Sequence, residues 1–266
     1  MLLAVDIGNT NIVFGCVDDD DNIILSERIS TNHSATSAEY AVLIKNILEM
    51  NGFGVKNITD AVMSSVVPSV TNTLKEAVRK LFGIEVMTAG PGVKTGLNIL
   101  IDNPRQLGSD QVVDAVAAVN NYPVPLIIID MGTATTVSVV DKNKNYLGGL
   151  IMTGMKTATD ALIKRTAQLP KIDFELPENI IGTNTVDCMK NGALYSNACA
   201  LDGIAERIEE NLGEKCTVIA TGGLAEVVVP LCRKNIILDK NLLIKGLTII
   251  HRKNKKKQEE KNYAVH

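Results

Sequence analysis

The sequence contains the same short pattern twice, at positions separated by 124 residues. In the first copy, apolar residues 2–5 lead into Asp6, one further residue, Gly8 and two small polar residues, and a second apolar run follows at residues 12–17. In the second copy, apolar residues 126–129 lead into Asp130, one further residue, Gly132 and a threonine, and three of residues 137–140 are valines. Each copy predicts a buried strand, a tight polar turn and a returning strand. Two such halves in one chain predict a duplicated domain with a cleft between the copies.

Each predicted turn places a carboxylate at the end of a strand, above exposed backbone N–H groups and hydroxyls. Such a turn can hold phosphate oxygens, and the carboxylate can hold a metal ion that bridges them. Two such turns facing one nucleotide resemble the phosphate clamp of the acetate-kinase, sugar-kinase, heat-shock-70 and actin superfamily. The alternative is that each is an ordinary hairpin turn whose aspartate only caps backbone N–H groups, but two copies in matching register argue against it.

The composition excludes several classes of function. Tryptophan is absent and aromatic residues make up 3% of the chain, which disfavours nucleic-acid modules that stack bases on aromatic platforms. The net charge is −3, although residues 252–262 carry six positive charges and two negative ones, so the body has no basic excess. No signal peptide or apolar run of membrane-spanning length is present. We therefore expect a cytoplasmic protein without nucleic-acid or membrane partners. The five cysteines lack metal-site spacing and lie mostly in apolar surroundings, so we expect buried free thiols.

Three further positions suggest a site. Asp110 stands at the start of a strongly apolar helical run, where it or Ser109 is either the N-cap of the helix or a residue that faces the cleft. Gly222 and Gly223 lie between a predicted strand and a predicted helix, where they allow either close approach of a ligand such as a nucleoside or tight strand–helix packing. Thr185 is expected to cap a long helix that continues to about residue 212.

The order of these pieces is similar to that of the type III pantothenate kinase family. The resemblance covers nearly the whole chain, to about residue 254. The matching pieces are Asp6-Ile7-Gly8-Asn9-Thr10-Asn11, Ser64-Ser65-Val66-Val67-Pro68, Gly90-Pro91-Gly92-Val93-Lys94-Thr95-Gly96-Leu97, Asp102-Asn103-Pro104, Gly108-Ser109-Asp110, Asp130-Met131-Gly132-Thr133-Ala134-Thr135-Thr136, Gly148-Gly149, Arg165-Thr166-Ala167-Gln168-Leu169-Pro170, Gly182-Thr183-Asn184-Thr185 and Ala220-Thr221-Gly222-Gly223.

The resemblance implies an α/β fold of two tandem ribonuclease-H-like (actin-like ATPase) domains with a nucleotide cleft between them. We place these domains at residues 1–115 and 116–254, and we expect residues 255–266 to be a basic, disordered tail. The implied activity is ATP-dependent phosphorylation of pantothenate to 4'-phosphopantothenate, the first step of coenzyme A biosynthesis. The implied cofactors are Mg²⁺ or another divalent cation and K⁺ or NH4⁺. The implied assembly is a homodimer with pantothenate near the subunit interface.

The resemblance also implies roles for individual residues. Asp110 corresponds to the general base on the pantothenate hydroxyl, Asp130 to the ligand of the monovalent cation, and Asp6 holds the divalent metal through the phosphates. The expected ATP-binding residues are Asp6, Ile7, Gly8, Asn9, Thr10, Asn11, Ile12, Val13, Thr133, Gly222 and Gly223. The expected substrate-binding residues are Ile101, Gly108, Ser109, Asp110, Gln111 and Thr185.

Two positions depart from the family pattern, and both fall on the acceptor side. Gln111 stands where the family usually has an arginine that binds the pantothenate carboxylate, and Ile101 stands where it usually has a tyrosine. Losing a charged partner costs on the order of 1.5–3 kcal/mol, or about 10- to 150-fold in affinity. Two alternatives therefore stay open: a paralogous kinase that uses another small alcohol, and a non-catalytic nucleotide-binding accessory or regulatory protein.

Overall fold

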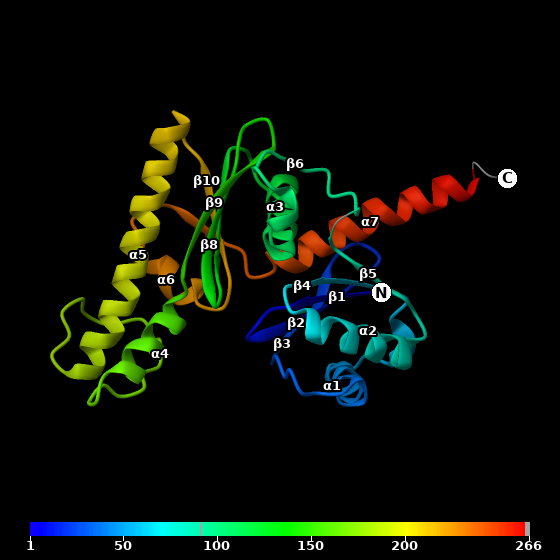
Figure 1. The fold of residues 1–266 in the computed structure, drawn as a ribbon, viewed down its shortest axis with the longest axis horizontal. Coiled ribbons are helices and arrows are strands. Elements are labelled where there is room, and N and C mark those ends of the chain that lie inside the picture. The colour runs from blue at the N-terminus through cyan, green and yellow to red at the C-terminus, as the bar shows by residue number, and fades with distance from the viewer. Residues whose placement is uncertain (91, 264–266) are drawn as a thin grey trace. The chain divides into compact units, whose positions relative to one another are not determined.

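The computed structural model describes residues 1–90 and 92–263, with side chains described as far as residue 256 (Figure 1). The chain forms two compact units. The first unit contains Met1–Gly96, Asn103–Ala117 and the segment from Asn241 onward, and the second contains Leu97–Asp102 and Ala118–Lys240. Pro91 of the glycine-rich motif and residues 264–266 of the predicted tail lie outside the described residues.

The first unit is built on a five-stranded sheet with the strand order β3-β2-β1-β4-β5. β1, β2 and β3 pair antiparallel, whereas β4 runs parallel to β1 and β5 runs parallel to β4. The elements of this unit are β1 (Leu2–Ile7), β2 (Asn11–Val17), β3 (Ile23–Ser30), α1 (Ser37–Met50), η1 (Val55–Asn57), β4 (Asp60–Ser65), α2 (Pro68–Phe82), β5 (Val86–Thr88), η2 (Pro104–Gln106), the first part of α3 (Ser109–Asn121) and α7 (Leu242–Tyr263).

The second unit repeats this plan and adds one strand. Its sheet has the order β11-β10-β7-β8-β9-β6, in which β7, β8 and β9 pair antiparallel and β10 and β11 continue parallel to β7. The added β6 pairs parallel with β9. The elements are β6 (Asn98–Ile99), the end of α3, β7 (Leu126–Met131), β8 (Ala134–Val140), β9 (Asn145–Thr153), α4 (Met155–Arg165), α5 (Thr185–Leu212), β10 (Thr217–Thr221), α6 (Ala225–Val228), η3 (Val229–Leu231) and β11 (Ile236–Leu238).

The duplication extends to the turns at the far ends of the hairpins. In the first unit, Asp18 Oδ1 accepts hydrogen bonds from Asp20 N at 3.0 Å and Asn22 N at 2.8 Å. In the second, Asp141 Oδ1 accepts from N of Asn143 and N of Asn145, both at 2.8 Å. Hydrogen bonds from Asn22 lower the pKa of Asp18. Burial alone would raise the pKa of Asp141, but its asparagine donors outweigh burial and lower it. Residues 18–21, which follow β2, are four aspartates. The first of them, Asp18, thus accepts the backbone N–H groups of this turn.

Local sequence explains where the helices begin and end. Thr36 and Glu39 form a reciprocal capping box at the start of α1. α2 starts at Pro68, whose fixed φ suits the first helical position, and ends at Gly83 in the left-handed conformation. α5 ends in the same way at Gly213. The end of α5 at Leu212 agrees with the sequence-based prediction.

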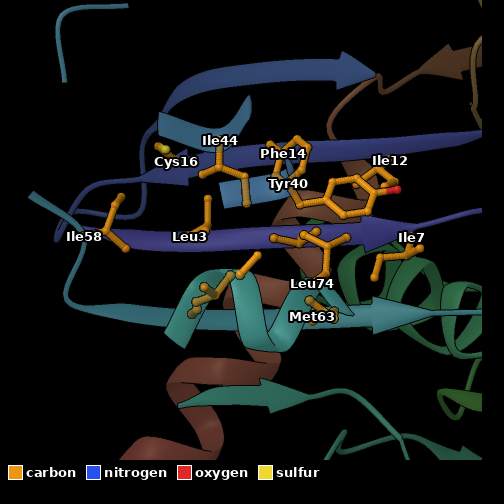
Figure 2. Packing of buried hydrophobic residues seen from close by; sticks show 14 of the residues in the cluster. Leu3, Ile7, Ile12, Phe14, Cys16, Tyr40, Ile44, Ile58, Met63 and Leu74 are labelled. Atoms are coloured by element: carbon orange, nitrogen blue, oxygen red, sulfur yellow. The ribbon is translucent and has the colours of Figure 1, made fainter. Parts of the chain in front are cut away.

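The first core is mainly aliphatic and lies between the sheet and α1 and α2. Figure 2 shows Leu3 and Ile7 of β1 beside Phe14 of β2, with Tyr40 of α1 and Leu74 of α2 close to them. The second core is likewise formed by β7, β8 and β10 with α5, and its members include Ile127, Ile129, Val137, Val218, Leu194, Ala198 and Leu201. Burying these faces supplies the main driving force for each unit.

The C-terminal region differs from the sequence-based prediction. We assigned residues 241–254 to the second domain, but α7 packs with the first unit, where it contacts β1, β2 and β4. Gly246 allows this packing, because a Cβ there would collide with the backbone of Val113 on α3. Residues 255–263, expected to form a disordered tail, continue α7 instead. Near its middle α7 is anchored by Lys255, whose Nζ lies 2.9 Å from Asp60 Oδ2.

One short helix and the cysteines also depart from expectation. The helix predicted after Gly223 is α6, a single turn that begins at Ala225. Cys16 is buried, but Cys188 and Cys199 on α5 are exposed, so the prediction of buried thiols is wrong for these two. Their apolar sequence neighbours lie on other faces of the long helix. None of the helices that the structure describes combines the length and apolar character of a membrane span.

Candidate active site

Asp6 lies at the end of β1, at the start of the first polar turn. In the sheet register it stands beside Ser64 of β4, whose hydroxyl donates a short hydrogen bond to Asp6 Oδ1. The turn is closed by Gly8 N, which donates to Asn11 O at 2.9 Å, and Thr31 Oγ1 donates to Gly8 O at 2.6 Å. The carboxylate and the polar turn therefore share one rigid strand end.

The predicted ATP-binding stretch contains two kinds of residue. The side chains of Ile7 and Ile12 are fully buried in the core of the first unit, so only their backbone groups can contact a ligand. Asn9 and Thr10 are exposed at the tip of the turn. The polar residues at the tip are thus available for phosphate oxygens, whereas the isoleucines hold the turn on the sheet.

Asp110 is brought to the same end of the first sheet. α3 begins at Ser109, and Val112 N donates to Gly108 O at 3.2 Å, so Ser109 and Asp110, which the sequence suggested as the N-cap, both lie inside the first turn of the helix. Ser109 Oγ donates to Ser65 O at 3.1 Å. Because Ser65 directly follows Ser64 on β4, this bond ties the start of α3 to the strand end that carries the partner of Asp6.

The geometry around Asp110 explains the glycine before it. A Cβ at Gly108 would collide with Asp110 Oδ1, so any larger residue would displace the carboxylate. Asp110 Oδ1 also accepts from Gln111 N at 2.9 Å. Asp110 and Gln111 are both partly exposed at the first turn of α3. The structure therefore groups Gly108, Ser109, Asp110 and Gln111 as one short segment at the helix start.

Asp130 occupies the equivalent place in the second unit, at the end of β7. Its register partner on the parallel strand β10 is Thr221, which is followed by Gly222. Gly222 has φ +93°, and a Cβ there would lie 2.5 Å from both Asp130 Oδ1 and Met131 N. The predicted cation ligand and the predicted nucleotide-binding glycine are therefore in contact.

Thr133 lies in the second polar turn, which is braced by the first turn of α4. Gly154 N and Thr157 Oγ1 donate to Thr133 O at 3.1 and 2.8 Å. A Cβ at Gly154 would collide with the carbonyl oxygens of Gly132 and Thr133. The close approach leaves the exposed Thr133 side chain at the tip of the turn.

Ile101 and Thr185, two predicted substrate contacts, both lie in the second unit. Ile101 Cγ2 would be 3.6 Å from a Cβ on Gly148, so the residue packs beside the bulge in β9. Thr185 is exposed at the first position of α5, and the helix is capped by Asn184, whose side chain accepts from Asp187 N at 3.0 Å. The prediction that Thr185 is the cap is therefore wrong. Thr185 lines a hollow of about 790 Å³ between α4 and α5.

The donor set fits a hard cation that arrives with phosphate oxygens. Among the side chains that the structure describes, no three His, Cys, Asp or Glu residues gather to hold a metal ion by themselves. Mg²⁺ in phosphotransferases is typically bound by one or two carboxylates together with substrate phosphates and water. A single carboxylate at a strand end, as Asp6 is, suits that arrangement.

The sequence reasoning missed the hydroxyl residues that support the site. Ser64, Ser65 and Thr157 were not assigned a role, although the first two belong to a motif that was singled out. Thr71 adds to this group, since its Oγ1 lies 2.7 Å from Ser65 Oγ. The available signal was the pair of adjacent serines that directly follow the apolar residues Ala61, Val62 and Met63 at the end of the strand.

Known proteins resemble this chain over nearly its whole length. The family model described as type III pantothenate kinase matches residues 2–207. The type III pantothenate kinase of Exiguobacterium sp. strain AT1b is 40% identical over 256 residues, which cover 96% of this chain and 100% of that protein. The type III pantothenate kinase of Exiguobacterium sibiricum is 42% identical over 255 residues, with the same coverage.

Solved structures support the fold at much lower identity. The activator of the 2-hydroxyisocaproyl-CoA dehydratase from Clostridium difficile, solved with bound ADPNP, has a TM-score of 0.53 at 14% identity and covers 97% of each chain. The ethanolamine utilization protein EutJ from Carboxydothermus hydrogenoformans has a TM-score of 0.52 at 14% identity and covers 93% of this chain and 89% of its own. Together with the repeated sheet order, these likenesses confirm the predicted α/β fold class. The relatives near 40% identity and the family match decide the classification, and the chain belongs to the type III pantothenate kinase family.

Proposed function

We propose that the protein transfers the γ-phosphoryl group of ATP to the primary hydroxyl of pantothenate and releases 4'-phosphopantothenate and ADP. This is the first step of coenzyme A biosynthesis. The observation that carries the proposal is family membership over 96% of the chain, together with the positions of three aspartates that match the family motifs: Asp6 and Asp130 lie at strand ends and Asp110 lies in the first turn of α3. The presence of all three carboxylates disfavours a non-catalytic accessory role.

On the donor side, the turn after β1 receives the phosphates. Phosphoryl transfer depends mainly on positioning and charge stabilisation, because its transition state is loose. Backbone N–H groups and the polar side chains of Asn9, Thr10 and Asn11 supply donors, and Asp6 supplies the carboxylate that holds a divalent cation on the phosphates. When bound, the cation neutralises charge on the phosphate oxygens. Thr133, Gly222 and Gly223 complete the nucleotide contacts in this proposal.

On the acceptor side, Asp110 accepts the proton of the pantothenate hydroxyl. A primary alcohol needs no strong base in a loose transition state, so an ordinary ionised aspartate suffices. The hydrogen bond from Ser109 to Ser65 holds the start of α3 on the sheet end that also carries Asp6. The bond thereby fixes the base at the same end of the first unit as the donor turn. Gly108, Gln111, Ile101 and Thr185 are the remaining acceptor contacts in this proposal.

Asp130 is the ligand of a monovalent cation, K⁺ or NH4⁺, in this proposal. The cation would neutralise the carboxylate beside the nucleotide and hold the turn that carries Thr133. Gly222 supports this role, because its lack of a side chain leaves room for the Asp130 carboxylate. A cation held there lies at the turn that mirrors the Asp6 turn of the first unit.

The protein forms a homodimer in this proposal, and the second unit carries a surface suited to it. The hollow between α4 and α5 adjoins a second hollow beside residues 180–182, and the two share Gly182, Cys188, Gly192 and Ser196 in their lining. Large apolar side chains remain exposed around them, among them Leu162, Ile180 and Ile181. Exposed apolar patches of this kind mark interaction surfaces. A second copy of the chain covers this surface in the proposed assembly.

The experiment that tests the activity is an ADP-release assay with ATP, Mg²⁺ and K⁺, with and without pantothenate over a wide concentration range. We expect release that depends on pantothenate and that Asp110→Asn abolishes while ATP binding survives. ADP release with another small alcohol but not with pantothenate would show that the acceptor is that alcohol and not pantothenate. ATP binding without ADP release on any alcohol would instead support the accessory role.

A further inference from the structure

Ser64 makes a contact that the proposed chemistry does not yet use. Its side chain has no solvent exposure, and it lies on β4 directly opposite Asp6. Its hydroxyl donates to Asp6 Oδ1. A buried hydroxyl that donates to a carboxylate at a strand end restricts the rotation of that carboxylate, because turning away would leave the hydroxyl without its partner. The bond therefore selects one orientation of Asp6.

The internal duplication repeats this placement. In the second unit the residue opposite Asp130 on the neighbouring parallel strand is Thr221, which also carries a hydroxyl and is 4% exposed. The two halves thus place a buried hydroxyl residue beside each of the two carboxylates, although the residue type differs. The three strand residues before each hydroxyl, Ala61, Val62 and Met63 in the first unit and Val218, Ile219 and Ala220 in the second, are apolar and buried. A buried hydroxyl residue opposite the carboxylate in both units supports a role tied to the carboxylate.

We propose that Ser64 is a positioning residue that holds the Asp6 carboxylate in the orientation needed to bind the metal–nucleotide complex. This inference rests on the proposed function, in which Asp6 holds the divalent cation through the phosphates. Hydrogen-bond partners that orient a metal-binding side chain typically change metal affinity or activity by about 10- to 100-fold when they are removed. Ser64 thus adds a determinant of donor binding that lies beneath the turn.

The alternative is that Ser64 only satisfies buried polar groups, as other buried serines do. Ser138 supplies the comparison. It is 2% exposed on β8 of the second unit, and its hydroxyl lies 2.9 Å from the hydroxyl of Tyr146. Ser138→Ala removes the same atoms from the same kind of environment, with no carboxylate as partner. A structural role predicts the same consequences for Ser64→Ala and Ser138→Ala.

The test is calorimetric titration of a non-hydrolysable ATP analogue into wild type, Ser64→Ala, Ser64→Cys and Ser138→Ala, once with Mg²⁺ and once with a chelator. No acceptor is present, so binding is measured apart from turnover. We expect Ser64→Ala to weaken binding in Mg²⁺ by about 10- to 100-fold. With the chelator it should change binding by less than about threefold, because the orientation matters for the metal. Ser64→Cys keeps a weak donor of similar size, so its affinity in Mg²⁺ should lie between that of the wild type and that of Ser64→Ala.

Melting temperatures of the free variants separate folding from positioning. We expect Ser138→Ala to lose stability comparable to that lost by Ser64→Ala and to keep wild-type nucleotide affinity in Mg²⁺. Wild-type affinity in Ser64→Ala, or an equal loss with Mg²⁺ and with the chelator, would overturn the inference while leaving the proposed function intact. Failure of the wild type itself to bind the analogue would instead refute the proposed function.

Discussion

Gly222→Ala tests whether the close contact between the two strands of the second unit controls the Asp130 site. Gly222 has φ +93°, in the region that residues with a side chain rarely adopt. A Cβ at this position would lie 2.5 Å from both Asp130 Oδ1 and Met131 N. Because one of these atoms belongs to the backbone of β7, the contact cannot be relieved by rotating a flexible side chain.

Gly213→Ala is the matched control for backbone strain. Gly213 has φ +71°, and a Cβ there would meet nothing within 4 Å. The left-handed conformation costs a non-glycine residue about 1–2 kcal/mol. Part of that cost is offset by about 0.4–1 kcal/mol, because alanine has less entropy to lose from the unfolded chain. We therefore expect Gly213→Ala to destabilise the protein only slightly.

Gly222→Ala should carry the same backbone cost plus overpacking, which typically adds about 1–3 kcal/mol. At about 2–4 °C per kcal/mol, its melting temperature should lie about 2–12 °C below that of Gly213→Ala. Activation of pantothenate-dependent ADP release by K⁺ should fall in Gly222→Ala and persist in Gly213→Ala, because only the former displaces Asp130. Equal melting temperatures together with unchanged K⁺ activation in Gly222→Ala would refute the reasoning.

Three further predictions follow from other parts of the chain. Burial lowers the pKa of His251 below 6.5 against the opposing pull of Asp60, so the folded protein binds this proton more weakly than the unfolded chain does, and stability should fall as pH drops below about 6.5. The free energy of unfolding, measured in urea at pH 7.5 and 5.5, should differ less between the two pH values in His251→Gln than in the wild type. An equal difference in the two proteins would contradict the prediction. Gln111→Arg should lower the half-saturating pantothenate concentration by about tenfold or more by restoring a partner for the carboxylate; a rise would show that the charge is supplied elsewhere. Ile181→Asp, at a side chain 79% exposed, should convert a dimer to a monomer in light scattering, whereas Met50→Asp on α1, 85% exposed, should not. A monomeric wild type would refute the proposed assembly.

Much of each unit follows from short-range sequence patterns. The repeated strand–turn–strand motifs predicted β1 with β2 and β7 with β8, because an apolar run, a glycine turn and a returning apolar strand are properties of a short stretch of consecutive residues. The bounds of α5 follow from its N-terminal Asn184 and the left-handed Gly213 that ends it. The aspartate at each strand end was likewise visible in the sequence.

Tertiary structure decided the features that depend on distant residues. Ser64 meets Asp6 only because β4 pairs parallel with β1, and that pairing joins residues 58 positions apart. α7 joins the first unit because Gly246 lets it approach Val113 and because Lys255 reaches Asp60, contacts that span more than 130 positions in the chain. The burial of each residue on a long helix depends on what packs against it, so Cys199 is exposed despite its apolar neighbours.

The sequence by itself therefore determined the duplicated plan, most strands and helices, and the identity of the three carboxylates. Those features are set by local backbone preference and by the period of apolar residues. Only the tertiary structure decided which hydroxyl residues lie beside Asp6 and Asp130, which glycines make room for Asp110 and Asp130, and which unit the last helix completes. These depend on strand pairing and side-chain packing between residues far apart in the chain, where many partners have suitable chemistry and only the folded geometry selects among them.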